Sequence, residues 1–106
     1  MKKIYFLLLL SIFTLNVNSQ IENNGIINFK AINIDLIKQI EINDNQANRL
    51  CKLILIKERR LQYVTDNSNS NLLIEKIKND FLLKARDFLS EDQIKRFKEI
   101  ESKFKY

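Results

Sequence analysis

The side chains that most often do chemistry are scarce in this sequence. It contains no histidine, one cysteine, one glycine and no proline. A Ser-His-Asp triad, a Cys-His pair, a multi-ligand zinc site and a glycine-rich phosphate loop all need residues that the chain lacks. We therefore expect no enzymatic activity, no metal site and no cofactor.

The acidic residues and the cysteine have simpler explanations than catalysis. Asp44, Glu91 and Asp92 each precede an apolar periodic stretch, where negative charge favours the start of a helix. Cys51 has no second cysteine to pair with, so it is buried, free, or bridging two subunits. Its position on one helical stripe with Leu50 and Ile54 favours a buried thiol.

A group of basic and apolar residues is the strongest binding candidate. At the helical period these residues fall within about 100° of arc, opposite the apolar stripe and without an acidic neighbour in that sector. We call them the basic-apolar face: Arg49, Lys52, Ile56, Arg59, Arg60 and Tyr63. Such a surface suits weak binding of apolar and acidic segments.

A second mixed patch is predicted on the following helix, from Leu72, Lys76, Leu83 and Arg86. The alternative for both surfaces is an ordinary solvated face whose apolar residues pack against a partner chain.

The elements that carry these residues are predicted to be helices. A chain poor in Gly and Pro and rich in Leu, Ile, Lys, Glu and Asn indicates an all-α fold. One-sided apolar stripes predict helices over 44–64, 72–88 and 91–104, with a polar joint at 65–71. Residues 29–40 fit a short helix or a strand, and we predict the helix. Residues 20–28 lack a period and are expected to be an irregular lead-in to a single helical domain at 29–106, built from long hairpins.

The first 19 residues predict a cleavable signal peptide. Lys2 and Lys3 precede an apolar run, and Val17 and Ser19 suit cleavage before Gln20. The run is shorter than the roughly 20 residues that span a bilayer, so an N-terminal anchor is the weaker alternative. Loss of this segment leaves 87 residues and lowers the net charge from +5 to +3, since two lysines leave with it. We expect a periplasmic or secreted protein.

Two predicted helix starts share one arrangement. Ser90 can cap the first free amides of its helix, Gln93 can reach back to the Ser90 amide, and Leu89 can pack on Ile94. The same order occurs 47 residues earlier, where Asn43 and Gln46 follow Ile42. Either copy alone is a good helix start; both together form a repeated motif.

The two copies, in an exported helical chain of this size, resemble the LTxxQ-motif periplasmic proteins, the Spy/CpxP-like family. Residues 89–93 look like that family's Leu-Thr-Pro-Glu-Gln, and residues 42–46 look like a diverged copy. Asn43 in place of Thr and the missing Pro depart from the pattern. The resemblance spans roughly residues 40–106. It implies a thin, curved helical homodimer that binds unfolded or partly folded envelope proteins without ATP, or restrains an envelope-stress sensor.

Three other functions are considered. The chain could be a specific interaction or inhibitory partner of one envelope protein, or a metal-sensing relative, because members of the same superfamily bind zinc, nickel or cobalt. Its basic face could also contact an anionic membrane surface weakly. Export argues against a nucleic-acid partner. Apolar residues off the main stripes, such as Leu53, Leu55 and Leu82, favour a homodimer.

Overall fold

The computed structural model describes residues 23–67 and 70–106. These residues form α2 (Asn23–Ile32), α3 (Ile34–Ile40), α4 (Asp44–Asn67), α5 (Asn71–Ala85) and α6 (Glu91–Ile100), followed by the 3-10 turn η1 (Glu101–Lys103). This part of the chain has no strand, so the all-α prediction is confirmed. The signal peptide predicted at 1–19, and residues 20–22 of the predicted lead-in, lie outside the described residues.

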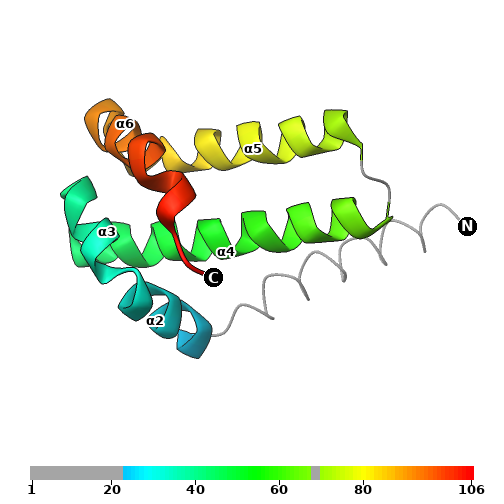
Figure 1. The fold of residues 1–106 in the computed structure, drawn as a ribbon. Helices are drawn as coiled ribbons and strands as arrows, with labels where there is room; N and C mark the ends of the chain where they lie inside the picture. The colour runs from blue at the N-terminus through cyan, green and yellow to red at the C-terminus, as the bar shows by residue number, and fades with distance from the viewer. Residues whose placement is uncertain (1–22, 68–69) are drawn as a thin grey trace, which may run out of the picture.

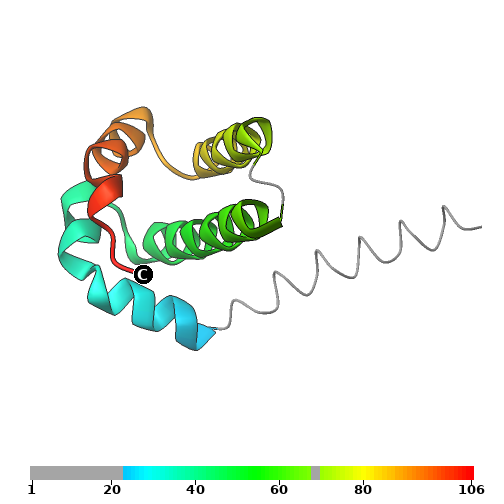
Figure 2. The same cartoon turned by 45° about the vertical axis from the view of Figure 1, so that its right-hand side comes forward.

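A long hairpin is the frame of the molecule. Helices α4 and α5 run antiparallel and in contact, and α2 packs on another side of α4 (Figure 1). At the open end of the hairpin, where α4 begins and α5 ends, α6 lies on α3, and the C-terminal segment returns across α2 and α4 (Figure 2). The connection at Arg86–Ser90 therefore turns the chain from the hairpin back onto its own beginning.

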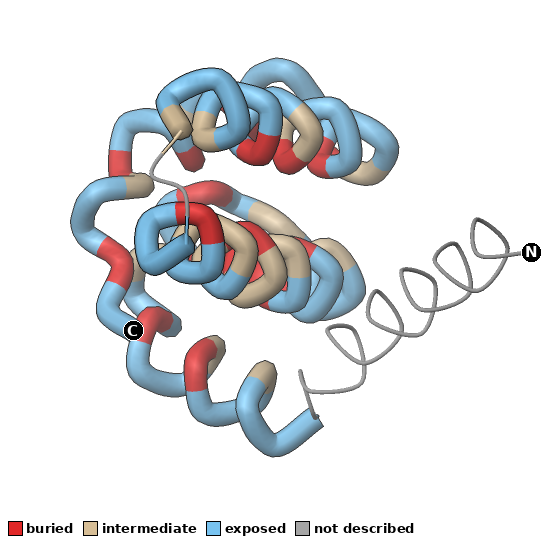
Figure 3. Tube along the Cα trace, turned by 90° about the vertical axis from the view of Figure 1, so that its right-hand side faces the viewer, coloured by how far each residue is buried: buried red, intermediate tan, exposed pale blue. Residues whose placement is uncertain are grey.

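The core follows the inner faces of these helices, where the buried positions gather (Figure 3). Leu50 and Ile54 of α4 lie at its centre. Aromatic rings connect the elements: Phe81 to Phe97 at 5.5 Å, Phe97 to Phe104 at 5.8 Å and Phe104 to Phe29 at 5.9 Å between centroids. The apolar stripes predicted for α4, α5 and α6 thus meet in one core.

The irregular lead-in predicted at 20–28 is wrong for residues 23–28, which belong to α2. Ile26 packs against the core and Phe29 is buried in it. The Lys30 ammonium also donates to the Asn48 side chain on α4, at 3.1 Å. These contacts stabilise a helix whose sequence has little apolar period, because tertiary packing supplies most of a helix's stability.

The single helix predicted over 29–40 is interrupted at Asn33, which separates α2 from α3. Asn33 is only 2% exposed. Its amide donates to the carbonyl oxygens of Phe29 and Lys105, both at 2.9 Å, and its oxygen accepts from the Lys105 amide at 2.8 Å. The break between α2 and α3 therefore places the Asn33 side chain where it hydrogen-bonds the backbone of the C-terminal segment.

The other helix boundaries differ from the predicted ones by a few residues. Helix α4 continues three residues past Val64 into the predicted polar joint; α5 is capped by Ser70 and ends at Ala85 instead of Phe88; α6 gives way to η1 after Ile100. The three leucines predicted to lie off the stripes are half-buried against the core: Leu53, Leu55 and Leu82.

Candidate functional site

The two copies of the helix-start motif have the same local geometry. Gln93 N–H donates to the Ser90 hydroxyl at 3.2 Å, and Ser90 N–H donates to the side-chain oxygen Oε1 of Gln93 at 2.9 Å. Gln46 N–H and the Asn43 side chain pair at 2.8 Å, and Asn43 N–H donates to Gln46 at 3.0 Å. Each pair satisfies two amides that a helix start leaves without partners.

The fold also brings the two copies together. Gln46 Nε2 donates to the Phe88 carbonyl at 2.8 Å and to Gln93 Oε1 at 3.2 Å. Gln93 Nε2 donates to the Glu41 carbonyl at 3.1 Å. Phe88 and Glu41 each lie two residues before the N-cap of their own copy, Ser90 and Asn43. Each glutamine therefore helps to cap its own helix and also hydrogen-bonds the backbone just before the other helix. Leu89 and Ile94 are buried, while Ile42 is half-buried beside the core.

The basic-apolar face lies along the side of α4 away from the core, and α5 borders one of its edges. Four members of the face are exposed, namely Arg49, Lys52, Arg59 and Tyr63, and 56% of the Tyr63 surface is accessible to solvent. Ile56 is half-buried in a narrow crevice whose walls include Ile77 of α5. The exposed part of the face is therefore narrower than the predicted arc.

Two of its arginines contact neighbouring elements. The Arg49 guanidinium lies 4.3 Å from the centroid of the Phe88 ring, a cation–π contact. The Arg60 guanidinium pairs with the Asp80 carboxylate of α5 at 3.6 Å. The basic-apolar face has no acidic residue of α4 in its sector, as expected from the sequence, but Asp80 of α5 lies at its edge. Charge reversal at Arg60 would therefore disturb the hairpin as well as the surface.

The second predicted patch stands on the outer side of α5 and the turn after it. Leu72 is 81% exposed and Leu83 is 62% exposed, three helical turns apart on one face. Lys76 between them and Arg86 after the helix are also exposed, and Arg86 pairs with Glu91 at 3.3 Å.

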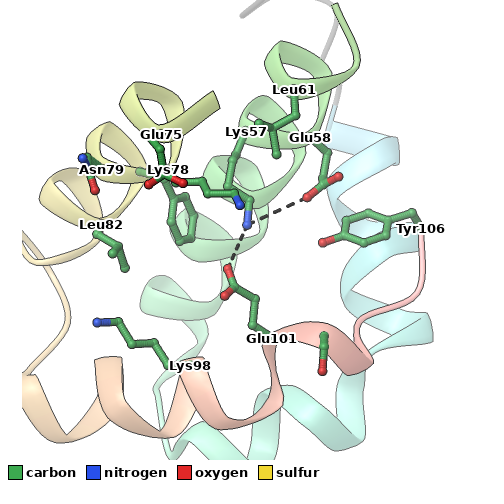
Figure 4. Close-up of a pocket in the computed structure, with 12 residues that line it drawn as sticks. Lys57, Glu58, Leu61, Glu75, Lys78, Asn79, Leu82, Lys98, Glu101 and Tyr106 are labelled. Atoms are coloured by element: carbon green, nitrogen blue, oxygen red, sulfur yellow. Dashed lines mark hydrogen bonds and ion pairs between the residues drawn. The ribbon is translucent and has the colours of Figure 1, made fainter. Parts of the chain in front are cut away.

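A cavity on the other side of the hairpin was not predicted. It measures about 670 Å³ and lies between α4, α5 and the α6–η1 segment (Figure 4). The Lys57 ammonium at its floor is held by Glu101 at 2.9 Å and Glu58 at 3.8 Å, and lies 4.6 Å from the centroid of the Phe81 ring. Burial, and then the Glu58 carboxylate to which it hydrogen-bonds, raise the pKa of Tyr106 at the rim.

The sequence alone gives only a weak sign that Lys57 is buried. It is only 6% exposed, although lysine is among the residues least often found inside. One signal was available: at 100° per residue it falls next to Leu50 and Leu61 on the inner side of the helix. Its partner Glu101 lies 44 residues away, so the pair itself depended on the fold.

Cys51 is buried, as the stripe predicts, and forms no disulfide. Burial raises the pKa of its thiol to about 11, and the nearby Lys30 charge opposes this only in part. A thiol with that pKa is a poor nucleophile at neutral pH. Across residues 23–67 and 70–106, no three His, Cys, Asp or Glu side chains gather where they could hold a metal ion, and no helix there is long and apolar enough to cross a membrane.

Comparisons with protein-family models, with curated proteins and with solved structures found no match to this chain.

Proposed function

We propose that this chain is an exported, ATP-independent chaperone or envelope-stress adaptor of the Spy/CpxP kind, which holds unfolded or partly folded polypeptides. The observation that carries the proposal is the exposed part of the basic-apolar face, where Lys52, Arg59 and Tyr63 stand along one side of α4. The paired glutamine motifs support the resemblance on which the envelope role rests.

Binding on this face has two components. The cations attract acidic stretches over a Debye length of about 8 Å at physiological salt. The Tyr63 ring and the aliphatic stems of Lys52 and Arg59 then bury modest apolar area. Neither component is large, so clients are captured broadly and released without nucleotide.

The test is suppression of aggregation by the purified mature protein, with several unrelated unfolded clients and no ATP. Lys52→Glu with Arg59→Glu should slow capture and reduce its salt dependence. Lys38→Glu with Lys95→Glu is the matched control, because it makes the same charge change at exposed sites on α3 and α6. Arg60 is left intact to preserve its pair with Asp80.

Equal protection by the face variant and the parent would show that clients bind elsewhere. Failure of the parent on every unrelated client, together with a tight stoichiometric complex with one envelope protein, would favour the specific inhibitory partner instead.

A homodimer forms part of the same proposal. Leu72 and Leu83 are exposed on one side of α5, and an antiparallel pairing of two α5 helices would set each Leu72 against the partner's Leu83. Small-angle scattering should give a dimer mass for the parent and a monomer mass for Leu72→Ser with Leu83→Ser. A monomer mass for the parent at all concentrations would reject the dimer.

A further inference from the structure

Asn33 binds the backbone of the C-terminal segment, residues 104–106. Its side-chain amide donates to the Lys105 carbonyl at 2.9 Å, and its side-chain oxygen accepts from the Lys105 N–H at 2.8 Å. One side chain therefore satisfies both backbone polar groups of one residue. Every residue except proline offers the same two groups, so this contact does not depend on the sequence of the segment.

Two aromatic contacts flank this backbone contact. The Phe104 and Tyr106 rings lie 5.9 Å and 5.5 Å from the Phe29 ring of α2, between centroids. The backbone at Phe104 is extended, and in an extended chain residues two apart point to the same side. The Lys105 side chain between them is exposed. The segment is therefore recognised at its two aromatic positions and at the backbone between them.

The helices on either side of Asn33 do not need its side chain. Backbone hydrogen bonds continue through the break, from Asn33 N–H to the Phe29 carbonyl at 3.2 Å and from Ile37 N–H to the Asn33 carbonyl at 3.0 Å. Asparagine is a weaker helix former than alanine or leucine, and burying its amide is costly unless the polar atoms are bonded. Its amide also donates to Phe29, which leaves one N–H and the oxygen for the segment. The residue type at position 33 is thus explained by what it binds.

The attached segment lies at the edge of the fold. Lys105 and Tyr106 are exposed, Tyr106 by 64%, and Phe104 alone of the three residues is buried. A separate peptide with the same aromatic spacing has the groups for the same contacts. The attached segment outcompetes it because a tether gives a high effective concentration.

We propose that Phe29 and Asn33 form a binding site for an extended polypeptide segment that has an aromatic residue on each side of one residue other than proline, and that residues 104–106 occupy this site as a tethered ligand. Glu58 of α4 hydrogen-bonds the Tyr106 hydroxyl, which favours tyrosine at the second aromatic position (Figure 4). Phe29, Asn33 and Glu58 are not members of the basic-apolar face, so the site is independent of the proposed function.

The test replaces the tethered segment with a free peptide. Lys105→Pro removes the N–H that the Asn33 oxygen accepts, and the extended backbone at Phe104 suits a following proline. Lys105→Ala is the matched control, because it loses the same exposed side chain and keeps the N–H. The probe is acetylated Ser-Lys-Phe-Lys-Tyr, the sequence of residues 102–106, titrated into the full mature chain labelled with ¹⁵N.

The probe should bind the Lys105→Pro variant at least about ten-fold more tightly than it binds the parent or Lys105→Ala, and it should shift the side-chain amide signals of Asn33. Ser-Lys-Phe-Pro-Tyr lacks the central N–H and Ser-Lys-Ala-Lys-Ala lacks both rings, so each should bind the variant at least about five-fold more weakly than the probe. Ser-Lys-Phe-Ser-Tyr should bind as tightly as the probe, because the central side chain is exposed. Adding Asn33→Ala to Lys105→Pro should remove the difference between the probe and the proline peptide.

Three results would overturn the proposal. These are no binding of the probe to the Lys105→Pro variant, equal binding of the probe and the two defective peptides, or binding without a shift at Asn33. Lys52→Glu with Arg59→Glu, added to Lys105→Pro, should leave peptide binding unchanged. Loss of aggregation suppression and loss of peptide binding are therefore distinguished in the same chain.

Discussion

Lys57 carries a positive charge into the contact between α4, α5 and η1. Its ammonium makes a 2.9 Å hydrogen bond to Glu101 and lies over the Phe81 ring. Desolvating a charge is costly, and the pair offsets that cost only while both partners are present.

Replacement of the two partners should therefore have unequal effects. Lys57→Met keeps the volume and removes the buried charge, so we expect a change within about 1 kcal/mol in the free energy of unfolding. Glu101→Gln leaves the ammonium with the more distant Glu58 and should cost about 1 to 2 kcal/mol. Urea unfolding of both variants measures the difference. A larger loss for Lys57→Met than for Glu101→Gln would contradict this account.

The buried Cys51 thiol should make the free energy of unfolding fall as the pH rises into the alkaline range. Burial raises its pKa from 9.0 to about 11, so the folded state keeps a proton that the unfolded chain loses. This contribution is fully present below pH 9 and falls as pH rises toward 11, by roughly 1.4 kcal/mol per pH unit. We expect the parent to lose its stability advantage over Cys51→Ala across this window. Tyr106→Phe is the control for Tyr106, whose pKa is also raised by burial. A constant difference between parent and Cys51→Ala would exclude this linkage.

The burial and exposure of single side chains could be predicted from the sequence where they depend only on the position of the residue in its own helix. Burial of Cys51 followed from its stripe, while the position of Lys57 on the inner side of α4 became meaningful only once Glu101 was placed beside it. On the basic-apolar face, the helical period correctly predicts that Lys52 and Arg59 are exposed. The contacts of Arg49 with Phe88 and of Arg60 with Asp80 could not be predicted in this way, because they depend on how α5 and the turn after it pack on α4.

The starts of α4 and α6 form the central joint between elements. Each of Gln46 and Gln93 bonds within its own cap and across to the other copy. The caps were readable from the sequence because they involve residues three apart. Their meeting was not, because it depends on how the chain turns after α5.

This joint should appear as coupling between two distant substitutions. Gln46→Ala and Gln93→Ala each remove one of the two capping-box bonds and the bonds to the other copy, so the double variant should lose less stability than the two single losses combined. We expect a coupling free energy of about 0.5 to 3 kcal/mol from a double-mutant cycle in urea. Ser90→Ala, which removes only a cap, should cost about 0.5 to 2 kcal/mol and show less coupling to Gln46→Ala. If the losses of the two single variants are additive, the contacts between the two glutamines and the opposite copies contribute no coupling free energy.

At the scale of the whole molecule, Asn33 joins the two ends of the described chain. Its side chain makes three hydrogen bonds, two of them to the backbone of Lys105, 72 residues away. The sequence indicated a helix through this position because Phe29, Ile37 and Ile40 keep a helical period on both sides of it. A polar residue inside that period was the one available sign of a break.

Asn33→Ala should release the C-terminal segment and cost about 1 to 3 kcal/mol, because buried polar groups lose their partners. Hydrogen exchange should show lost protection at the Lys105 amide with little change at the start of α6. Asn28→Ala, at an exposed site of α2, is the control. Retained protection at Lys105 in Asn33→Ala would show that the aromatic contacts of Phe104 and Tyr106 alone hold the segment.

The bond between Asn33 and Lys105 also affects the order in which contacts form during folding. The two residues are 72 positions apart, so closing this contact costs more chain entropy than closing the contacts within the α4–α5 hairpin. We expect the hairpin to form before the C-terminal segment docks on Asn33, because contacts between residues close in sequence form first.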